Sequence, residues 1–160
     1  DIALIGLSTA LPTPPGFATG TLGEEQLARF EACLSALGKA GLFRVVLLHH
    51  PPLEDESVRK RLTDAAAFRA VVARAGAELV LHGHDHTYGI TEIPGPNGPV
   101  PVAGVPSASA RRHRRPAAAY YLFRIRRNNT GWTLSMRVRA YVPEQQDFRD
   151  EETREFTTAA

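Results

Sequence analysis

The sequence predicts an α/β fold in which parallel strand-helix units are followed by an antiparallel hairpin. Apolar, strand-like runs alternate with helical patterns over residues 2–82, and residues 120–141 alternate apolar and polar side chains around a turn signal. Strands that alternate with helices are typical of parallel sheets joined by right-handed crossovers. The 160 residues, 43% of them hydrophobic and 22% charged, have the size and composition of one domain with a core.

The first strand-helix unit lies in residues 2–39. Residues 2–7 are a continuous apolar run, which predicts a buried strand. A proline-rich segment, residues 11–16, is predicted to be a loop that borders a site. Thr21 and Glu24 have the spacing of a capping box, so we expect a helix to begin there, and Gly41 ends it after about Lys39.

The next units repeat this order. Residues 43–48 form a second buried apolar run, which predicts a strand. Thr63 or Asp64 is expected to cap a second helix that Gly76 ends, and residues 79–82 form the third strand. We expect the intervening residues 53–61 to be an exposed loop or a short helix.

The second half of the chain has a different pattern. Residues 102–105 are predicted to be a short strand, and residues 120–126 and 132–141 flank Asn-Asn-Thr-Gly, which indicates a hairpin. Trp132 and Met136 are interpreted as core residues of its second arm. Residues 143–160 are charged and lack apolar periodicity, so they are predicted to be a charged tail.

Composition limits the kinds of partner. The net charge of +2 and pI of about 9.0 suit an anionic small molecule but give no specific indication of nucleic-acid binding. The single cysteine, Cys33, cannot form an intrachain disulfide, which is compatible with a cytoplasmic protein. No apolar run approaches the roughly 20 residues of a membrane-spanning helix.

Five of the six histidines follow two of the predicted strands: His49 and His50 after one, and His82, His84 and His86 at the end of another. The carboxyl ends of parallel strands meet at one edge of a sheet, where ligands bind. Neutral imidazoles are good ligands for ions such as Zn, Fe, Mn and Co. The sequence therefore predicts a metal site at this edge.

The members of this set have different expected roles. His49, His84 and His86 are the candidate ligands, because alternate residues of an extended segment project to one side. His50 should point elsewhere than His49, so it is a candidate for supporting the ligands, as is Asp85. His82 is interpreted as the last buried residue of its strand.

At these residues the sequence resembles the calcineurin-like metallophosphoesterases. Leu47-Leu48-His49-His50-Pro51 is similar to the family's strand-end histidine motif, and Gly83-His84-Asp85-His86 is similar to its Gly-His-x-His motif. Further segments, Ile5-Gly6-Leu7, residues 20–26 and residues 105–109, resemble bacterial members close to the cyclic-nucleotide phosphodiesterases. The resemblance implies a four-layer α/β/β/α sandwich with two metal ions, in which His49 and His84 bind one ion and His86 the other.

The chain also departs from the family. It lacks the Asp-x-His, Gly-Asp-x-x-Asp and Gly-Asn-His motifs, which supply the remaining ligands, the bridging carboxylate and the catalytic histidine. We therefore expect residues 1–142 to be the C-terminal part of the domain, with the N-terminal half absent. This fragment alone would be inactive, and an exposed sheet edge would pair with the missing half or with another chain.

The resemblance implies that the intact protein hydrolyses phosphodiesters, such as cyclic nucleotides, or phosphomonoesters. Two metal ions would hold the phosphate and supply a hydroxide. Arg111, Arg112 and His113 are candidates for binding the substrate, since arginine matches phosphate oxygens, although a solvated basic loop is the simpler interpretation. Tyr88 is more simply a packing residue than a platform for a base.

Two other functions stay open. The chain would also suit a degenerate, non-catalytic module that binds a metal or a partner. A mononuclear zinc hydrolase with His49, His84, His86 and water as ligands is chemically permissible, but no general base accompanies it. No Gly-x-Ser-x-Gly elbow or phosphate-binding P-loop occurs in the sequence, which argues against a serine hydrolase and a P-loop NTPase.

Overall fold

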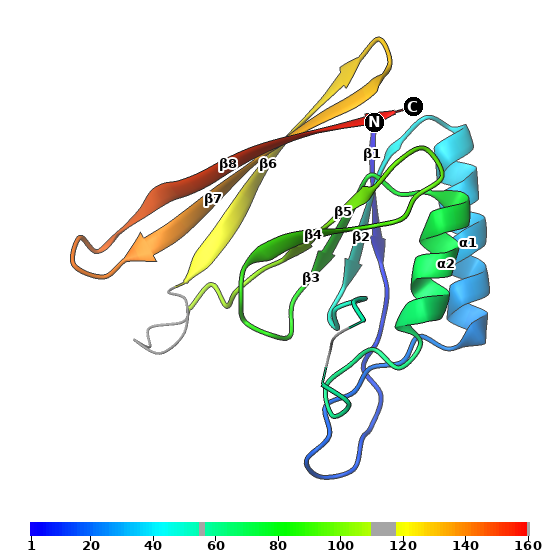
Figure 1. Ribbon diagram of the computed structural model, residues 1–160, viewed down its shortest axis with the longest axis horizontal. Helices are drawn as coiled ribbons and strands as arrows, with labels where there is room; N and C mark the ends of the chain where they lie inside the picture. The colour runs from blue at the N-terminus through cyan, green and yellow to red at the C-terminus, as the bar shows by residue number, and fades with distance from the viewer. Residues whose placement is uncertain (55–56, 110–117, 160) are drawn as a thin grey trace.

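Three layers make up the part of the chain that the computed structural model describes, which is residues 1–54, 57–109 and 118–159. Helices α1 (Glu24–Lys39) and α2 (Ala65–Ala75) cover one face of a five-stranded sheet, and a three-stranded sheet covers the other face (Figure 1). The predicted α/β class is confirmed. Within the described residues the order of layers is helices, sheet, sheet.

The five-stranded sheet has the strand order β1-β2-β3-β5-β4. Its neighbours are parallel except for β4, which runs antiparallel to β5. The strands are β1 (Ile2–Gly6), β2 (Phe43–Leu48), β3 (Leu79–His82), β4 (Gly89–Ile93) and β5 (Val100–Gly104). The three predicted strands of the first half are therefore confirmed, and β2 and β3 end at the residues that the apolar runs indicate.

Strand β1 is not the buried strand that its apolar run predicts. It pairs only with β2 and forms the edge of the sheet. Ile2 and Leu4 lie in register with Phe43 and Val45 on the face that carries the three-stranded sheet, yet 50% and 70% of their surfaces are exposed. The buried-strand prediction fails because no described element covers this part of that face, and an apolar run does not tell an edge strand from a central one.

The helix layer packs as the periodicity predicts. Phe30 of α1 stacks on Phe68 of α2 with the ring centroids 5.4 Å apart, and both side chains are buried against the sheet. The predicted capping box is wrong: α1 begins after Gly23 without a side-chain cap, and the Thr21 hydroxyl lies 2.6 Å from that of Thr63. The Asp64 carboxylate accepts hydrogen bonds from the backbone N–H groups of Leu22 and Gly23 rather than capping α2.

The three-stranded sheet is antiparallel and consists of β6 (Ala119–Asn128), β7 (Gly131–Val142) and β8 (Asp147–Ala159). The hairpin prediction is confirmed, and Trp132 and Met136 are buried. The charged-tail prediction for residues 143–160 is wrong for residues 147–159, because β8 pairs with β7 on both sides of one irregularity at Val138 and Arg139. Charge does not exclude a strand here, since Asp150 of β8 forms ion pairs with Arg137 and Arg139 of β7.

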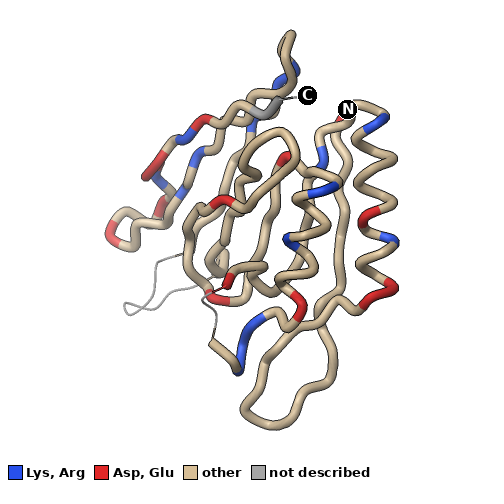
Figure 2. The backbone as a smooth tube through the Cα atoms, turned by 45° about the vertical axis from the view of Figure 1, so that its right-hand side comes forward, with Lys and Arg blue, Asp and Glu red and all other residues tan. Residues whose placement is uncertain are grey.

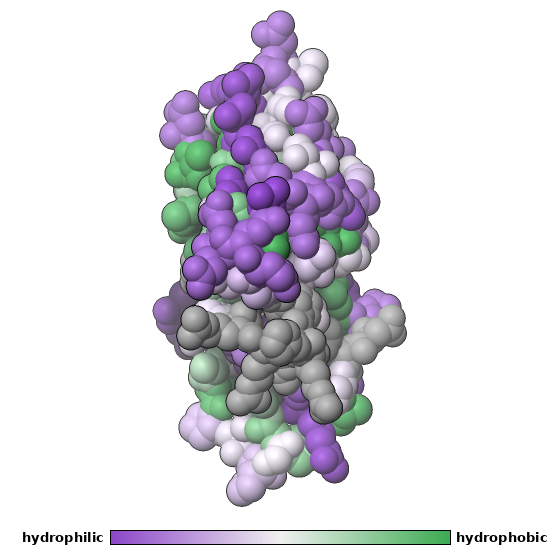
Figure 3. Space-filling model, turned by 90° about the vertical axis from the view of Figure 1, so that its left-hand side faces the viewer, coloured by the Kyte–Doolittle hydropathy of each residue, from purple (hydrophilic) through white to green (hydrophobic). Residues whose placement is uncertain are grey.

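The two sheets meet through one apolar cluster. Phe43, Val45 and Leu79 from the first sheet pack against Trp132 and Leu134 of β7. On the side of the molecule that carries the three-stranded sheet, hydrophilic residues gather in the upper part of the view, beside smaller hydrophobic patches (Figure 3). Among the described residues, neither helix has the length and apolar composition needed to cross a membrane.

A buried ion pair lies at the amino end of the parallel strands. Arg44 in β2 donates from Nη2 to Oε1 of Glu78 at 2.6 Å and from Nε to Oε2 at 3.0 Å. Its Nη1 donates to the carbonyl oxygens of Leu34 and Ala75, near the ends of the two helices. The two side chains thereby connect β2, β3, α1 and α2, and the Arg44 and Glu78 side chains are only 11% and 9% exposed.

Candidate metal centre

The two histidine segments meet at the carboxyl ends of β2 and β3. His49 and His50 follow β2, and His84 lies two residues beyond β3. Because β2 and β3 are parallel neighbours, their ends are adjacent, and the Gly83 N–H donates to the His49 carbonyl at 3.1 Å. The prediction that sheet topology brings the two segments together is confirmed.

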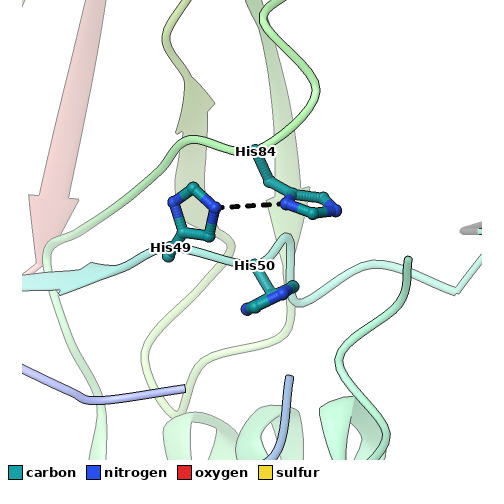
Figure 4. Close-up of side chains that lie close together, drawn as sticks. All are labelled: His49, His50 and His84. Carbon is teal, nitrogen blue, oxygen red and sulfur yellow. Dashed lines mark hydrogen bonds between the residues drawn. The ribbon is translucent and has the colours of Figure 1, made fainter. Parts of the chain in front are cut away.

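Three of the imidazoles form a compact group. His49, His50 and His84 each offer a ring nitrogen within 4.8 Å of the others, so the group could hold a metal ion (Figure 4). His49 Nε2 and His84 Nδ1 point at one another and are 3.1 Å apart. Two imidazole nitrogens that share one ion at about 2.1 Å lie roughly 3.0–3.4 Å apart. The separation fits a shared ion as well as an N–H···N hydrogen bond.

His84 has the features of a ligand rather than of a packing residue. Its Nε2 is buried and has no hydrogen-bond partner among the described residues, and such atoms are rare in native interiors. Its backbone φ of 74° lies in the left-handed region, which costs a non-glycine residue about 1–2 kcal/mol. Burial lowers the pKa of His84, and the charges of His49 and Lys60 act in the same direction. The ring is therefore neutral near pH 7, as a metal ligand must be.

His50 belongs to the group but is bonded elsewhere. Its Nδ1 lies 2.7 Å from the Thr9 hydroxyl, and its Nε2 lies 3.0 Å from the Ala18 carbonyl oxygen. Only 5% of its surface is exposed, and burial lowers its pKa. Both nitrogens therefore have protein partners. The prediction that His50 points elsewhere than His49 is wrong, because its ring lies within the group, 4.5 Å from the His84 ring between centroids.

His82 and Asp85 lie beside the group. His82 is buried at the end of β3, as predicted, with Nδ1 3.1 Å from the Gly83 carbonyl oxygen, and burial lowers its pKa. The charge of Asp85 opposes the lowering of the pKa of His82, His84 and His50. Asp85 and His82 also line a cavity of about 210 Å³ next to β4 and β5.

Other predicted site residues are not part of this group. His86 has a left-handed φ of 55° and is exposed, and it lies outside the set of three imidazoles. Arg111, Arg112 and His113 lie outside the described residues. Tyr88 is 39% exposed rather than packed, and an interaction with Glu151 of β8 raises its pKa. Within the described part of the chain, no carboxylate joins the three histidines.

A basic turn near the histidines was not identified as a site from the sequence. Arg59, Lys60 and Arg61 lie at the end of the molecule where the loops follow the strands (Figure 2). The carbonyls of Arg59 and Arg61 accept hydrogen bonds from the Ala18 and Gly20 N–H groups at 2.7 and 3.1 Å. Three consecutive cations between a histidine pair and a helix were the available signal, although such runs are usually only solvated surface.

Comparison with known proteins yields a likeness in fold. No family model matches the chain, and no curated protein matches it. Among solved structures, it is similar to "GAP50 the anchor in the inner membrane complex of Plasmodium", with a TM-score of 0.53 and 12% sequence identity. The likeness covers 85% of this chain and 43% of that chain, so the present chain corresponds to less than half of that protein. At this identity the comparison establishes the arrangement of helices and sheets.

Proposed function

We propose that this chain supplies part of a metal centre for the hydrolysis of phosphoesters. The observation that carries the proposal is the convergence of His49 Nε2 and His84 Nδ1, 3.1 Å apart at the ends of adjacent parallel strands. The motif resemblance to the calcineurin-like metallophosphoesterases supports the same two residues as ligands of one ion. Sites beyond the carboxyl ends of parallel strands are where α/β proteins bind ligands.

Histidine-bound metal ions acidify a bound water and neutralise charge on phosphate oxygens. The chain's own residues prepare the site for such chemistry. Burial keeps His84 neutral, so its ring nitrogens are available as ligands near pH 7. Lys60 and its neighbours place positive charge beside the histidines, where an anionic phosphoester would be attracted. Arg111, Arg112 and His113 remain proposed substrate-binding residues.

A dinuclear centre needs more groups than the three imidazoles. We propose that His86 binds a second ion and that a bridging carboxylate comes from elsewhere in the complete domain. The four-layer sandwich belongs to the same proposal, since this chain corresponds to 43% of its structural neighbour. Mn, Fe, Zn and Co are all compatible with an imidazole-rich ligand set.

A non-catalytic binding module is the second candidate. The absence of a carboxylate from the group of described histidines favours it. A structural neighbour, the anchor in the inner membrane complex of Plasmodium, also gives an example of a similar fold in a binding role. In this alternative the histidines hold an ion that shapes a binding surface and no reaction follows.

Metal content and hydrolysis test both candidates together. Elemental analysis would compare the wild type with His49→Ala and His84→Ala, while Cys33→Ser controls for metal bound by the exposed thiol. Hydrolysis of bis-p-nitrophenyl phosphate would be followed in the complete protein, because the proposed bridging carboxylate comes from outside this chain. Metal and turnover that both disappear in the histidine variants support the hydrolase. Bound metal without turnover supports the binding module, and a wild type that binds no metal contradicts both.

A further inference from the structure

The His50 side chain lies between the site and the loop of residues 9–20. One ring nitrogen contacts Thr9 at the beginning of this loop, and the other contacts Ala18 near its end. The Ala18 carbonyl can only accept a hydrogen bond, so His50 Nε2 must carry the proton. In the neutral ring Nδ1 then has a lone pair, and the Thr9 hydroxyl donates to it.

Gly20 provides the space for this ring. A Cβ atom added at Gly20 would lie 2.3 Å from His50 Nδ1 and 2.6 Å from Cγ, distances that only a displaced ring or loop could relieve. The backbone of Gly20 also donates to the Arg61 carbonyl and accepts from the Thr63 N–H. The loop, the His50 ring and the basic turn are therefore fastened together at one point.

Such a ring is poorly suited to bind metal. Coordination through Nε2 would break the hydrogen bond to Ala18. Coordination through Nδ1 would leave the buried Thr9 hydroxyl without its acceptor, which costs about 1–3 kcal/mol. His84 differs, because its buried Nε2 has no hydrogen bond to another described residue that coordination would break. The three histidines lie close together, but we assign them two different roles: His49 and His84 are candidate metal ligands, and His50 is not.

We propose that His50 is a positioning residue, a clamp that holds the 9–20 loop and the basic turn of residues 59–61 against the edge where His49 and His84 bind metal. This role rests on the proposed function for its purpose, but the clamp itself does not depend on bound metal. The loop thereby forms one wall of the site, and the turn brings Lys60 toward the place of an anionic ligand.

Hydrogen exchange of residues 11–19 in the metal-free protein tests the clamp. We expect His50→Ala, Thr9→Val and Gly20→Ala, on three different segments, each to accelerate exchange in this loop about tenfold, the effect of losing one net hydrogen bond. His50→Gln keeps an N–H group near the position of Nε2 and should restore part of the protection. Exchange in β7, which lies in the other sheet, should not change and controls for global unfolding.

Zinc binding by the same variants separates a clamp from a ligand. The three clamp variants should keep the wild-type number of ions per chain, whereas His49→Ala should lose it. Loss of zinc in His50→Ala and in His50→Gln, with normal loop exchange, would overturn the proposal. Unchanged exchange in Gly20→Ala would also overturn it. A wild type without zinc contradicts the proposed function alone, since loop exchange is measured without metal.

Discussion

Both ends of the parallel strands carry buried ionisable side chains, but the hydrogen-bond partners of these side chains differ between the two ends. At the amino end, Arg44 and Glu78 bond to each other, and Arg44 also bonds to two helix carbonyls. At the carboxyl end, His84 has one ring nitrogen facing His49, and its other ring nitrogen is buried without a partner among the described residues. Backbone conformation differs in the same way. Among the described residues, the left-handed positions before β2 and β3, at the amino end, are glycines, Gly41 and Gly76, whereas those after β3, at the carboxyl end, are His84 and His86.

The difference indicates which polar groups stabilise the fold and which are kept for a ligand. A buried charge with a complete set of hydrogen bonds connects the elements around it, and its loss leaves an unpaired partner. A buried nitrogen without a partner, on strained backbone, contributes no such connection and is typical of functional sites. We therefore expect mutations at the amino end mainly to lower the stability of the fold, and mutations at the carboxyl end mainly to lower metal binding.

The largest effect on stability is expected at the amino end. Glu78→Ala leaves the Arg44 guanidinium buried and unpaired, so the free energy of unfolding should fall by about 3–5 kcal/mol. Urea unfolding followed by circular dichroism measures this. Glu31→Ala, which removes the partner of Arg74 at the surface, is the matched control and should change the urea midpoint little. Equal losses for the two pairs would contradict the comparison.

At the carboxyl end, we expect binding to be lost without a loss of stability. His84→Gly removes a candidate ligand and relieves the left-handed backbone, so metal binding should disappear while metal-free stability stays constant or rises by up to about 1 kcal/mol. Isothermal titration with Zn²⁺ and urea unfolding give the two readouts. Gln146→Gly, which relieves φ of 53° in the β7–β8 turn, should stabilise similarly and leave binding intact.

Acid should weaken the carboxyl end specifically. Burial lowers the pKa values of His50, His82 and His84 below the ordinary value of 6.5, so the unfolded chain binds more protons than the native protein below that pH. Stability should therefore be constant above about pH 6.5 with respect to these groups and decrease as pH falls below it. Urea midpoints between pH 7.5 and 5 measure the slope, which should be shallower in His82→Asn.

The smallest effect on stability is expected for Lys60, a charge that no described ion pair uses. Lys60→Gln should change the free energy of unfolding by less than about 0.5 kcal/mol, as exposed substitutions do. It should nevertheless weaken the inhibition of phosphoester hydrolysis by inorganic phosphate severalfold, because one cation beside the histidines is removed. Lys39→Gln, on the exposed last turn of α1, is the control. Equal phosphate inhibition in both variants would argue against an anion site here.

Local sequence patterns predict the elements whose structure depends on neighbouring residues in the chain. The buried strands β2 and β3 follow continuous apolar runs, and sheet topology then requires His49 and His84 to be neighbours. The helix ends at Lys39 and Ala75 follow from the glycines beyond them. The hairpin follows from strict alternation around its turn.

The remaining features depend on partners that are distant in sequence. Thr21 has capping-box spacing but faces Thr63, 42 residues away, and this contact cannot be read from a local motif. Strand β8 is charged, and it is ordered by pairing with a strand whose arginines match its acids. The role of His50 required knowing that Thr9 and Ala18 surround it. A run of apolar residues likewise did not reveal that Leu4 would be uncovered.

The connectivity of the three-stranded sheet has a consequence for the order of folding. Strands β6, β7 and β8 follow one another along the chain and pair in sequence order. Each pairing therefore closes only a short loop, which costs little conformational entropy and occurs on the order of microseconds. Pairing of β1 with β2 must instead enclose the whole of α1. We therefore expect the three-stranded sheet to form first, and the edge of the five-stranded sheet that carries His49 and His84 to form late. Trp132, which packs on Phe43 across the sheets, provides a fluorescence signal for the docking step between these events.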